Sequence, residues 1–165
     1  MKRPFYTLLI IGAILFTSLL SSCKDALVYD QFTHTPIAGW EKNDTLSFEI
    51  PPIAASGYYQ EQLGLRITGA YPFMGLTLIV EQTIYPDKEK KWEKTVKVDT
   101  IQCDLIDKNG VTKGQGISYY QYDFPINVYH ISEKDSIHVT VRHDMKREIL
   151  PGISDIGLKL SRVKE

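Results

Sequence analysis

The stretch Ile137-His138-Val139-Thr140-Val141-Arg142 decides the fold of this chain, because apolar and polar side chains alternate at every position. A period of two is typical of a β-strand with one buried face and one exposed face. Helical periodicity is nearly absent, and we expect a helical turn only at Asp144–Leu150, before Pro151-Gly152. The same alternation predicts further strands at Leu46–Ile50, Leu63–Ile67, Leu76–Val80 with an extension towards Ile84, and Ile156–Leu160.

The central part of the chain predicts more strands and the turns between them. The apolar phase changes between Val96-Lys97-Val98 and Ile101-Gln102-Cys103, which favours a bulge or a corner. Asn109-Gly110 indicates a tight turn. A strand through Tyr120–Phe124 follows, where Pro125 is allowed only at an edge or a bulge. Seven or eight strands predict an all-β fold: an antiparallel β-sandwich of jelly-roll or immunoglobulin-like type over residues 36–165.

The N-terminus is typical of a secreted, lipid-anchored protein. Lys2 and Arg3 precede an apolar run, and small residues lead to Leu20-Ser21-Ser22-Cys23, which fits the bacterial lipobox. The apolar stretch Leu8–Leu20 is shorter than the roughly 20 residues that span a bilayer, which argues against an uncleaved anchor. We therefore expect residues 1–22 to be a signal peptide, Cys23 to carry lipid that binds the membrane, and residues 23–35 to be a tether.

The net charge and the number of cysteines bear on which partners and which covalent links the chain can have. Loss of residues 1–22 removes two basic residues and no acidic ones, so the formal net charge changes from −1 to −3. No basic stripe remains, and we expect no nucleic-acid partner. Cys103 is the only other cysteine and lies in the apolar phase of its strand. We therefore expect a buried, inert thiol and no intramolecular disulfide.

The residues that carry enzyme chemistry do not form a recognisable pattern. The four histidines lack the same-face spacing of a zinc site and are interpreted as surface residues: His34, His130, His138 and His143. Asp104, Asp107 and Asn109 resemble a calcium-binding loop, but the spacing of an EF-hand is missing and a turn explains Asp107 and Asn109 better. The chain has no Gly-x-Ser-x-Gly elbow. We expect no metal, no cofactor, no catalytic residues and no enzyme activity.

Aromatic residues suggest an alternative. Exposed rings on a sheet would form a platform for sugar rings, as in carbohydrate-binding modules, although tyrosines also fill half-buried sheet faces and protein interfaces. A glycan-binding lipoprotein with a polysaccharide partner is therefore a second hypothesis. The rings concerned are Tyr58, Tyr59, Tyr71, Phe73, Tyr119, Tyr120 and Tyr122.

Four further segments stand out: Cys23–Phe32 followed by Trp40, Leu65-Arg66 followed by Tyr71–Leu78, Asp99–Ile101 leading to Asp107–Gly110 and Gly114–Gly116, and Arg147–Leu158. In this order they resemble one family, the gliding-motility-associated lipoprotein family GldH of the Bacteroidetes.

The resemblance implies a component of the cell-surface gliding machinery that contacts other envelope proteins. Within these segments we regard Arg66, Tyr71, Phe73 and Arg147 as candidate interaction residues. Lys24 after the cysteine argues against retention at the inner membrane, so we expect an outer-membrane location and leave the side of that membrane open.

Overall fold

The computed structural model describes residues 26–87 and 93–163, and in these ranges the chain is all-β, as predicted. Every pairing between strands is antiparallel. The strands are β1 (Ala26–His34), β2 (Trp40–Glu41), β3 (Leu46–Ile50), β4 (Gly57–Thr68), β5 (Gly75–Tyr85), β6 (Thr95–Asp104), β7 (Tyr119–Ile131), β8 (Ser136–His143), β9 (Ile149–Leu150) and β10 (Ile153–Arg162).

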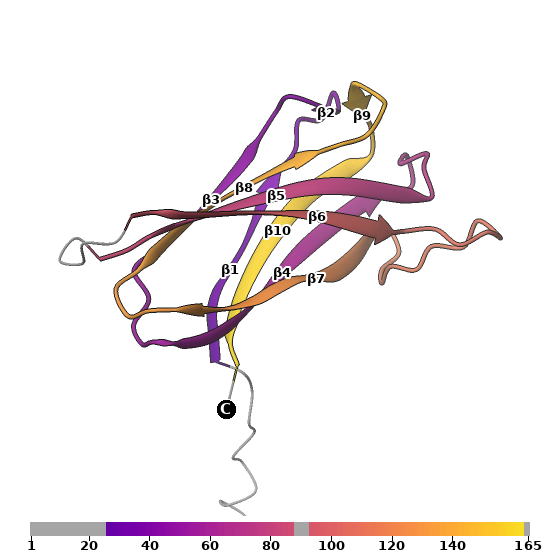
Figure 1. The fold of residues 1–165 in the computed structure, drawn as a ribbon. Helices are drawn as coiled ribbons and strands as arrows, with labels where there is room; N and C mark the ends of the chain where they lie inside the picture. Colours follow the sequence, from indigo (N-terminus) through magenta and orange to yellow (C-terminus); the bar gives the residue numbers. More distant parts are fainter. Residues whose placement is uncertain (1–25, 88–92, 164–165) are drawn as a thin grey trace, which may run out of the picture.

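Two four-stranded sheets form a sandwich (Figure 1). The first sheet has the order β1-β10-β4-β7, and the second has the order β3-β8-β5-β6. A short ladder of β2 and β9 lies at the end of the molecule opposite the C-terminus (Figure 1). The predicted sandwich architecture is therefore confirmed.

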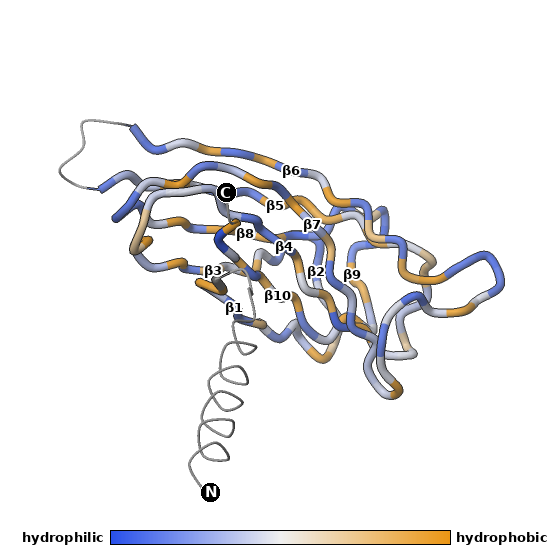
Figure 2. Tube along the Cα trace, turned by 90° about the horizontal axis from the view of Figure 1, so that it is seen from below, coloured by the Kyte–Doolittle hydropathy of each residue, from blue (hydrophilic) through white to orange (hydrophobic). Residues whose placement is uncertain are grey.

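The core fills the space between the inner faces of the two sheets. Along β8, Ile137, Val139 and Val141 are buried while the intervening side chains are partly or fully exposed. Figure 2 shows this pattern as alternating hydrophobic and hydrophilic bands along the strands. Each fully buried Leu, Ile or Val side chain contributes about 1.5–3 kcal/mol to folding. Because no disulfide is found among the described residues, this packing holds the two sheets together.

The expected tether is largely a strand. Ala26–His34 forms β1 and pairs with β10 along its length, from Ala26↔Arg162 to His34↔Asp155. Simple alternation fails to predict this strand because it has a bulge between Leu27 and Tyr29.

An aromatic residue on the outer face of β1 also disturbs the alternation. The Phe32 ring covers Gly64 of β4 and Gly157 of β10, so closely that a Cβ on either glycine would lie within 2.7 Å of ring carbons. β1 therefore uses apolar side chains on both of its faces.

The expected bulge in β6 does not occur. β6 pairs with β5 without a register shift, from Gly75↔Asp104 to Ile84↔Thr95. Val96 and Val98 are exposed on the outer face, whereas Lys97 and Asp99 share the inner face with Gln82 and Val80 of β5. The change of apolar phase therefore reflects charged residues that face inward at the sheet edge, not a bent strand.

Two other local predictions have opposite outcomes. Pro125 lies in β7, an outer strand, next to a bulge opposite Glu61 and Gln62, as predicted. The helical turn expected at Asp144–Leu150 is wrong, because residues 144–148 form bends and Ile149–Leu150 is β9. Burial of Leu150 beside Trp40 explains the strand, since both side chains are inaccessible to solvent.

Candidate interaction surface

The two ends of the sandwich differ in their relation to the predicted lipid anchor. β1 begins at Ala26, three residues after Cys23, and its first residue pairs with Arg162 near the C-terminus. Eight steps along β1, about 27 Å at the usual rise of a strand, lead to His34 towards the opposite end. Figure 1 shows β1 starting near the C-terminus at the bottom and β2 and β9 at the top. We call the exposed part of residues 36–41, 71–77 and 144–149 the distal surface.

The turn before β5 is fixed by an aromatic pair. Tyr71 is buried, and its hydroxyl donates a hydrogen bond of 2.8 Å to the carbonyl oxygen of Gly75. Its ring meets the Phe73 ring edge to face at 5.6 Å. Tyr71 therefore supports the surface from beneath, while Phe73 is partly exposed on it.

Residues 144–147 lie against the start of β5. The amide of Asp144 donates to the Thr77 carbonyl oxygen at 2.8 Å, and the Thr77 amide donates to Met145 Sδ at 3.4 Å. These contacts bring two predicted interaction residues, Phe73 and Arg147, to one depression of about 570 Å³. Its other lining residues are Thr77, Asp144, Met145 and Lys146.

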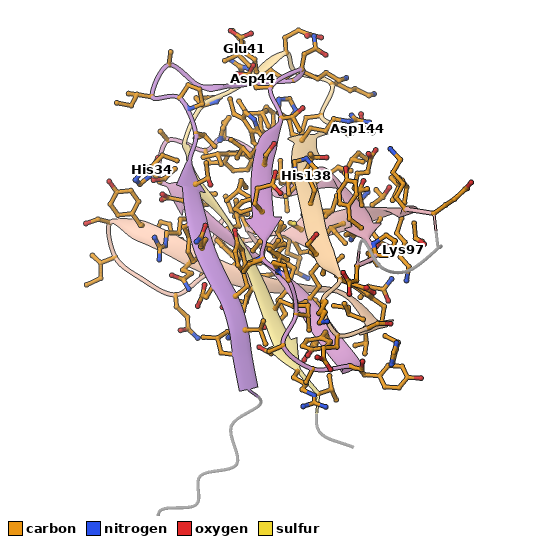
Figure 3. The ribbon with its side chains drawn as sticks, turned by 90° about the vertical axis from the view of Figure 1, so that its left-hand side faces the viewer. His34, Glu41, Asp44, Lys97, His138 and Asp144 are labelled. Atoms are coloured by element: carbon orange, nitrogen blue, oxygen red, sulfur yellow. The ribbon has the colours of Figure 1, made fainter. Side chains whose placement is uncertain are left out.

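Exposed apolar side chains accompany the depression. Ile37 is fully exposed, and Met74 and Ile149 are 56% and 45% exposed. Figure 3 shows Glu41, Asp44 and Asp144 at this same end, away from the chain termini. The distal surface thus combines apolar anchors with an exposed Arg147, whose Nε donates to the Ile149 carbonyl oxygen at 3.0 Å.

A buried aromatic cluster holds the distal loops in place. The indole Nε1 of Trp40 donates to the Asp44 carbonyl oxygen at 3.1 Å, and the ring packs edge to face with His143 at 5.3 Å. His143 is buried, which corrects the expectation that all four histidines lie at the surface. Burial lowers the pKa of His143, so its imidazole is neutral near pH 7. This histidine serves packing, with Nε2 3.2 Å from the Trp40 carbonyl oxygen.

Arg66 belongs to a different face. It lies half-buried on the outside of the first sheet, where its guanidinium carbon is 3.9 Å from the centre of the Phe32 ring. Its Nε donates to Gln121 Oε1 at 3.2 Å. The partners of its guanidinium are therefore an amide and an aromatic ring. Arg66 therefore braces three strands and is not part of the distal surface.

A polar cluster that the sequence pattern did not predict lies between the sheets. Glu61 and Gln82 are both fully buried, and Gln82 Nε2 donates to Glu61 Oε2 at 3.0 Å and to Asp99 Oδ2 at 3.1 Å. Burial raises the pKa of Glu61 to about 7, and the Asp99 carboxylate adds to the rise, while the hydrogen bond from Gln82 opposes it. The position of Glu61 between Tyr59 and Leu63 in the inward phase was the available signal.

The residues considered for calcium form a turn, as predicted. Asp107 Oδ1 accepts hydrogen bonds from the amides of Asn109 and Val111 at 2.8 and 2.9 Å, and these bonds lower its pKa. Asp104 pairs with Lys113 at 3.6 Å. In residues 26–87 and 93–163, no three His, Cys, Asp or Glu side chains gather as a metal site would require.

The aromatic residues do not form a flat exposed platform in the described ranges. Tyr59, Tyr71 and Tyr122 are buried, and the Tyr122 ring stacks on that of Phe124 with their centres 6.0 Å apart. Tyr58 and Tyr119 are exposed, but Tyr58 meets His130 edge to face. Phe73 and Tyr120 are partly exposed, so the seven rings are spread over the core, the surface and the positions between them.

Two features concern the cysteines and the membrane. Cys103 is buried, as predicted, and burial raises the pKa of its thiol to about 12, which disfavours the reactive thiolate. The lipobox and Cys23 lie outside the described residues. Among the described residues, no helix is long and apolar enough to cross a membrane.

These features define the class of protein: a β-sandwich domain that follows directly on a predicted lipidation site and has a mixed apolar and basic surface at the opposite end. Comparison with known proteins then gives the family. The model of the GldH lipoprotein family matches residues 27–160, and the chain belongs to this family. It is accordingly a lipid-anchored protein of the cell envelope.

Two curated relatives cover nearly the whole chain. A gliding motility lipoprotein GldH from Flavobacterium johnsoniae is 27% identical over 161 residues, 90% of this chain and 93% of the relative. A GldH homolog from Christiangramia forsetii is 25% identical over 172 residues, 98% of each chain. A family 35 carbohydrate-binding module from Clostridium thermocellum is 8% identical, with a TM-score of 0.36, over 87% of this chain and all of that one; so low a score carries no inference.

Proposed function

We propose that this chain is a non-enzymatic component of the cell-surface gliding machinery, anchored in the outer membrane through lipid on Cys23 and bound to other envelope proteins through the distal surface. The observation that carries the proposal is that the start of β1 and the distal surface lie at opposite ends of the sandwich. The predicted lipidation site precedes one end of β1, whereas Ile37, Met74 and Ile149 are exposed at the other.

The composition of the distal surface supports protein binding. Interfaces are enriched in aromatic, Met and Arg side chains with an apolar centre. Phe73, Met74 and Arg147 provide these types, and Lys146 adds a second positive charge. A partner with an apolar patch bordered by a carboxylate for Arg147 would complement this surface. The names of the curated relatives, both gliding motility lipoproteins, point to the gliding machinery as the source of that partner.

Crosslinked co-purification of the tagged full-length chain from intact envelopes tests the proposal. We expect the same envelope proteins to be captured repeatedly, and to be lost with Met74→Asp/Ile149→Asp and with Cys23→Ala. Val128→Asp is the matched control, since Val128 is 51% exposed on β7 and should keep every partner. Unchanged capture by the distal double variant would refute the assignment of the surface. Capture of glycan fragments without protein would favour the glycan-binding alternative.

A further inference from the structure

The outer strands of the two sheets differ in how they are protected against pairing with another strand. β1 has a bulge, β7 has a bulge and Pro125, and β3 has only five residues. Bulges, prolines, short length and inward-facing charges all block an open sheet edge. β6 has none of the first three: its ten residues pair with β5 without a register shift, and its sequence contains no proline. It does carry two inward-facing charges, Lys97 and Asp99, which guard the edge only as long as no partner strand neutralises them.

The open edge of β6 also carries exposed apolar side chains. Val96 and Val98 are 49% and 58% exposed on its outer face. Figure 3 shows Lys97, the residue between them, at the side of the molecule, away from both termini. A lipid anchor at the N-terminus therefore leaves this edge accessible. A long, regular edge of this kind is a template for an added strand.

Two charged residues on β6 lack an ion-pair partner. Lys97 lies over the Tyr129 ring, 4.7 Å from its centre, and Asp99 accepts a hydrogen bond from Gln82. Within the part of the chain that the structure describes, neither forms an ion pair. Their opposite charges, two positions apart on one face of the strand, make the edge complementary to itself.

We propose that the β6 edge binds β6 of a second copy of this chain, antiparallel and centred on Val98, so that two four-stranded sheets join into one. This register places Lys97 opposite Asp99 of the second copy, twice, and Val96 opposite its Thr100. Opposite charges and β-branched residues in such cross-strand positions stabilise a sheet, and like charges destabilise it. A register centred on Lys97 or on Asp99 would oppose like charges, whereas a register centred on Val98 pairs each lysine with an aspartate.

Cysteine substitutions in the full-length chain test the register. Residues opposite each other in antiparallel strands have Cα atoms about 5 Å apart, within reach of a disulfide. We expect Val98→Cys in isolated membranes to form a covalent dimer on mild oxidation. Val96→Cys alone should not, because four residues along the strand separate the two copies by about 14 Å. Val96→Cys/Thr100→Cys should restore the dimer.

Three results of the crosslinking experiment would contradict the proposed dimer. Absence of the Val98→Cys dimer, equal crosslinking of Val96→Cys, or crosslinking of Val98→Cys to a different protein would each overturn the proposal. Cys103 is buried and does not compete.

Mass measurement of the lipidated chain in detergent gives an independent test. We expect a dimer for the unchanged chain and for Val128→Lys, a matched substitution on β7 with similar exposure. Val98→Lys places two lysines opposite each other at the centre and should halve the mass. A monomeric unchanged chain, or a dimer that survives Val98→Lys, would overturn the proposal. Neither result bears on capture of partners by the distal surface, so the two proposals can fail separately.

Discussion

The buried carboxyl of Glu61 makes a specific prediction about how stability depends on pH. Glu61 is inaccessible to solvent between the sheets, and its Oε1 has no hydrogen-bond partner. Burial, with the Asp99 carboxylate nearby, opposes the negative charge more strongly than the hydrogen bond from Gln82 and the positive charge of Lys97 stabilise it. The substitution Glu61→Gln keeps the shape and an acceptor for Gln82 but removes the titration.

The sign and the magnitude follow from the pKa in the two states. Below pH 4.5 Glu61 is protonated whether the chain is folded or unfolded, so its titration does not change the free energy of unfolding there. Between 4.5 and about 7 only the folded chain keeps the proton, so the free energy of unfolding falls by about 1.4 kcal/mol for each pH unit. Above pH 7 the free energy of unfolding falls no further on account of Glu61, and its total decrease is about 3 kcal/mol.

Urea unfolding of the unchanged chain and of Glu61→Gln from pH 4.5 to 8.5 measures this effect. Titrating groups that do not interact with Glu61 are shared by both proteins, so they cancel in the difference between the two free energies of unfolding. We expect the free energy of unfolding of Glu61→Gln to rise relative to that of the unchanged chain as the pH rises, and to exceed it by about 3 kcal/mol at pH 8. A difference that stays constant across this range would refute the argument that Glu61 is held neutral by burial.

Three further predictions concern single residues. Gly116→Ala should lower the free energy of unfolding by about 1–3 kcal/mol, because Gly116 has φ +136° and a Cβ there would collide with the Tyr119 carbonyl. Gly110→Ala is the comparison: Gly110 has φ +80° but open space around it, so the same urea titration should show a decrease of only about 1 kcal/mol. Phe32→Ala should lower the free energy of unfolding by about 2 kcal/mol, because the ring covers two glycines of neighbouring strands, and an unchanged urea midpoint would contradict this. Cys103 should resist a thiol reagent at pH 8 until urea unfolds the chain, and rapid labelling of the folded protein would show that the thiol is accessible.

The sequence predicts strands well where one face is buried and the other is solvated. β3, β5, β8 and β10 follow the alternation of apolar side chains because both sheets are antiparallel and only their inner faces are covered. The alternation of apolar and polar side chains breaks in β1, because Phe32 packs on the outer face of the sheet as well as apolar residues on the inner face. It breaks in β6 because a charged side chain, Lys97, faces inward. These exceptions depend on neighbouring strands, which one sequence does not reveal.

The candidate surface was predictable only in part. Phe73 and Arg147 were identified from the segments that resemble the family, but their meeting in one depression depends on the packing of residues 144–147 against β5. Ile37 was not identified, because an apolar residue in a loop gives no sign of its exposure. Glu61 was missed for the opposite reason: a charged residue within a strand is normally assigned to the exposed face.

The distal surface consists of loops, yet these loops are held firmly by the core. Tyr71 closes the turn before β5 through its bond to Gly75, and Trp40 holds the loop after β2 through Asp44. Ile149 belongs to β9 and pairs with Glu41 of β2, which fixes the third segment. A partner would therefore meet side chains that are already in place and would avoid much of the entropy cost of ordering loops on binding. Because that rigidity comes from buried aromatic rings, a substitution such as Trp40→Ala should weaken partner binding without touching a single contact residue, through loss of order in the surface.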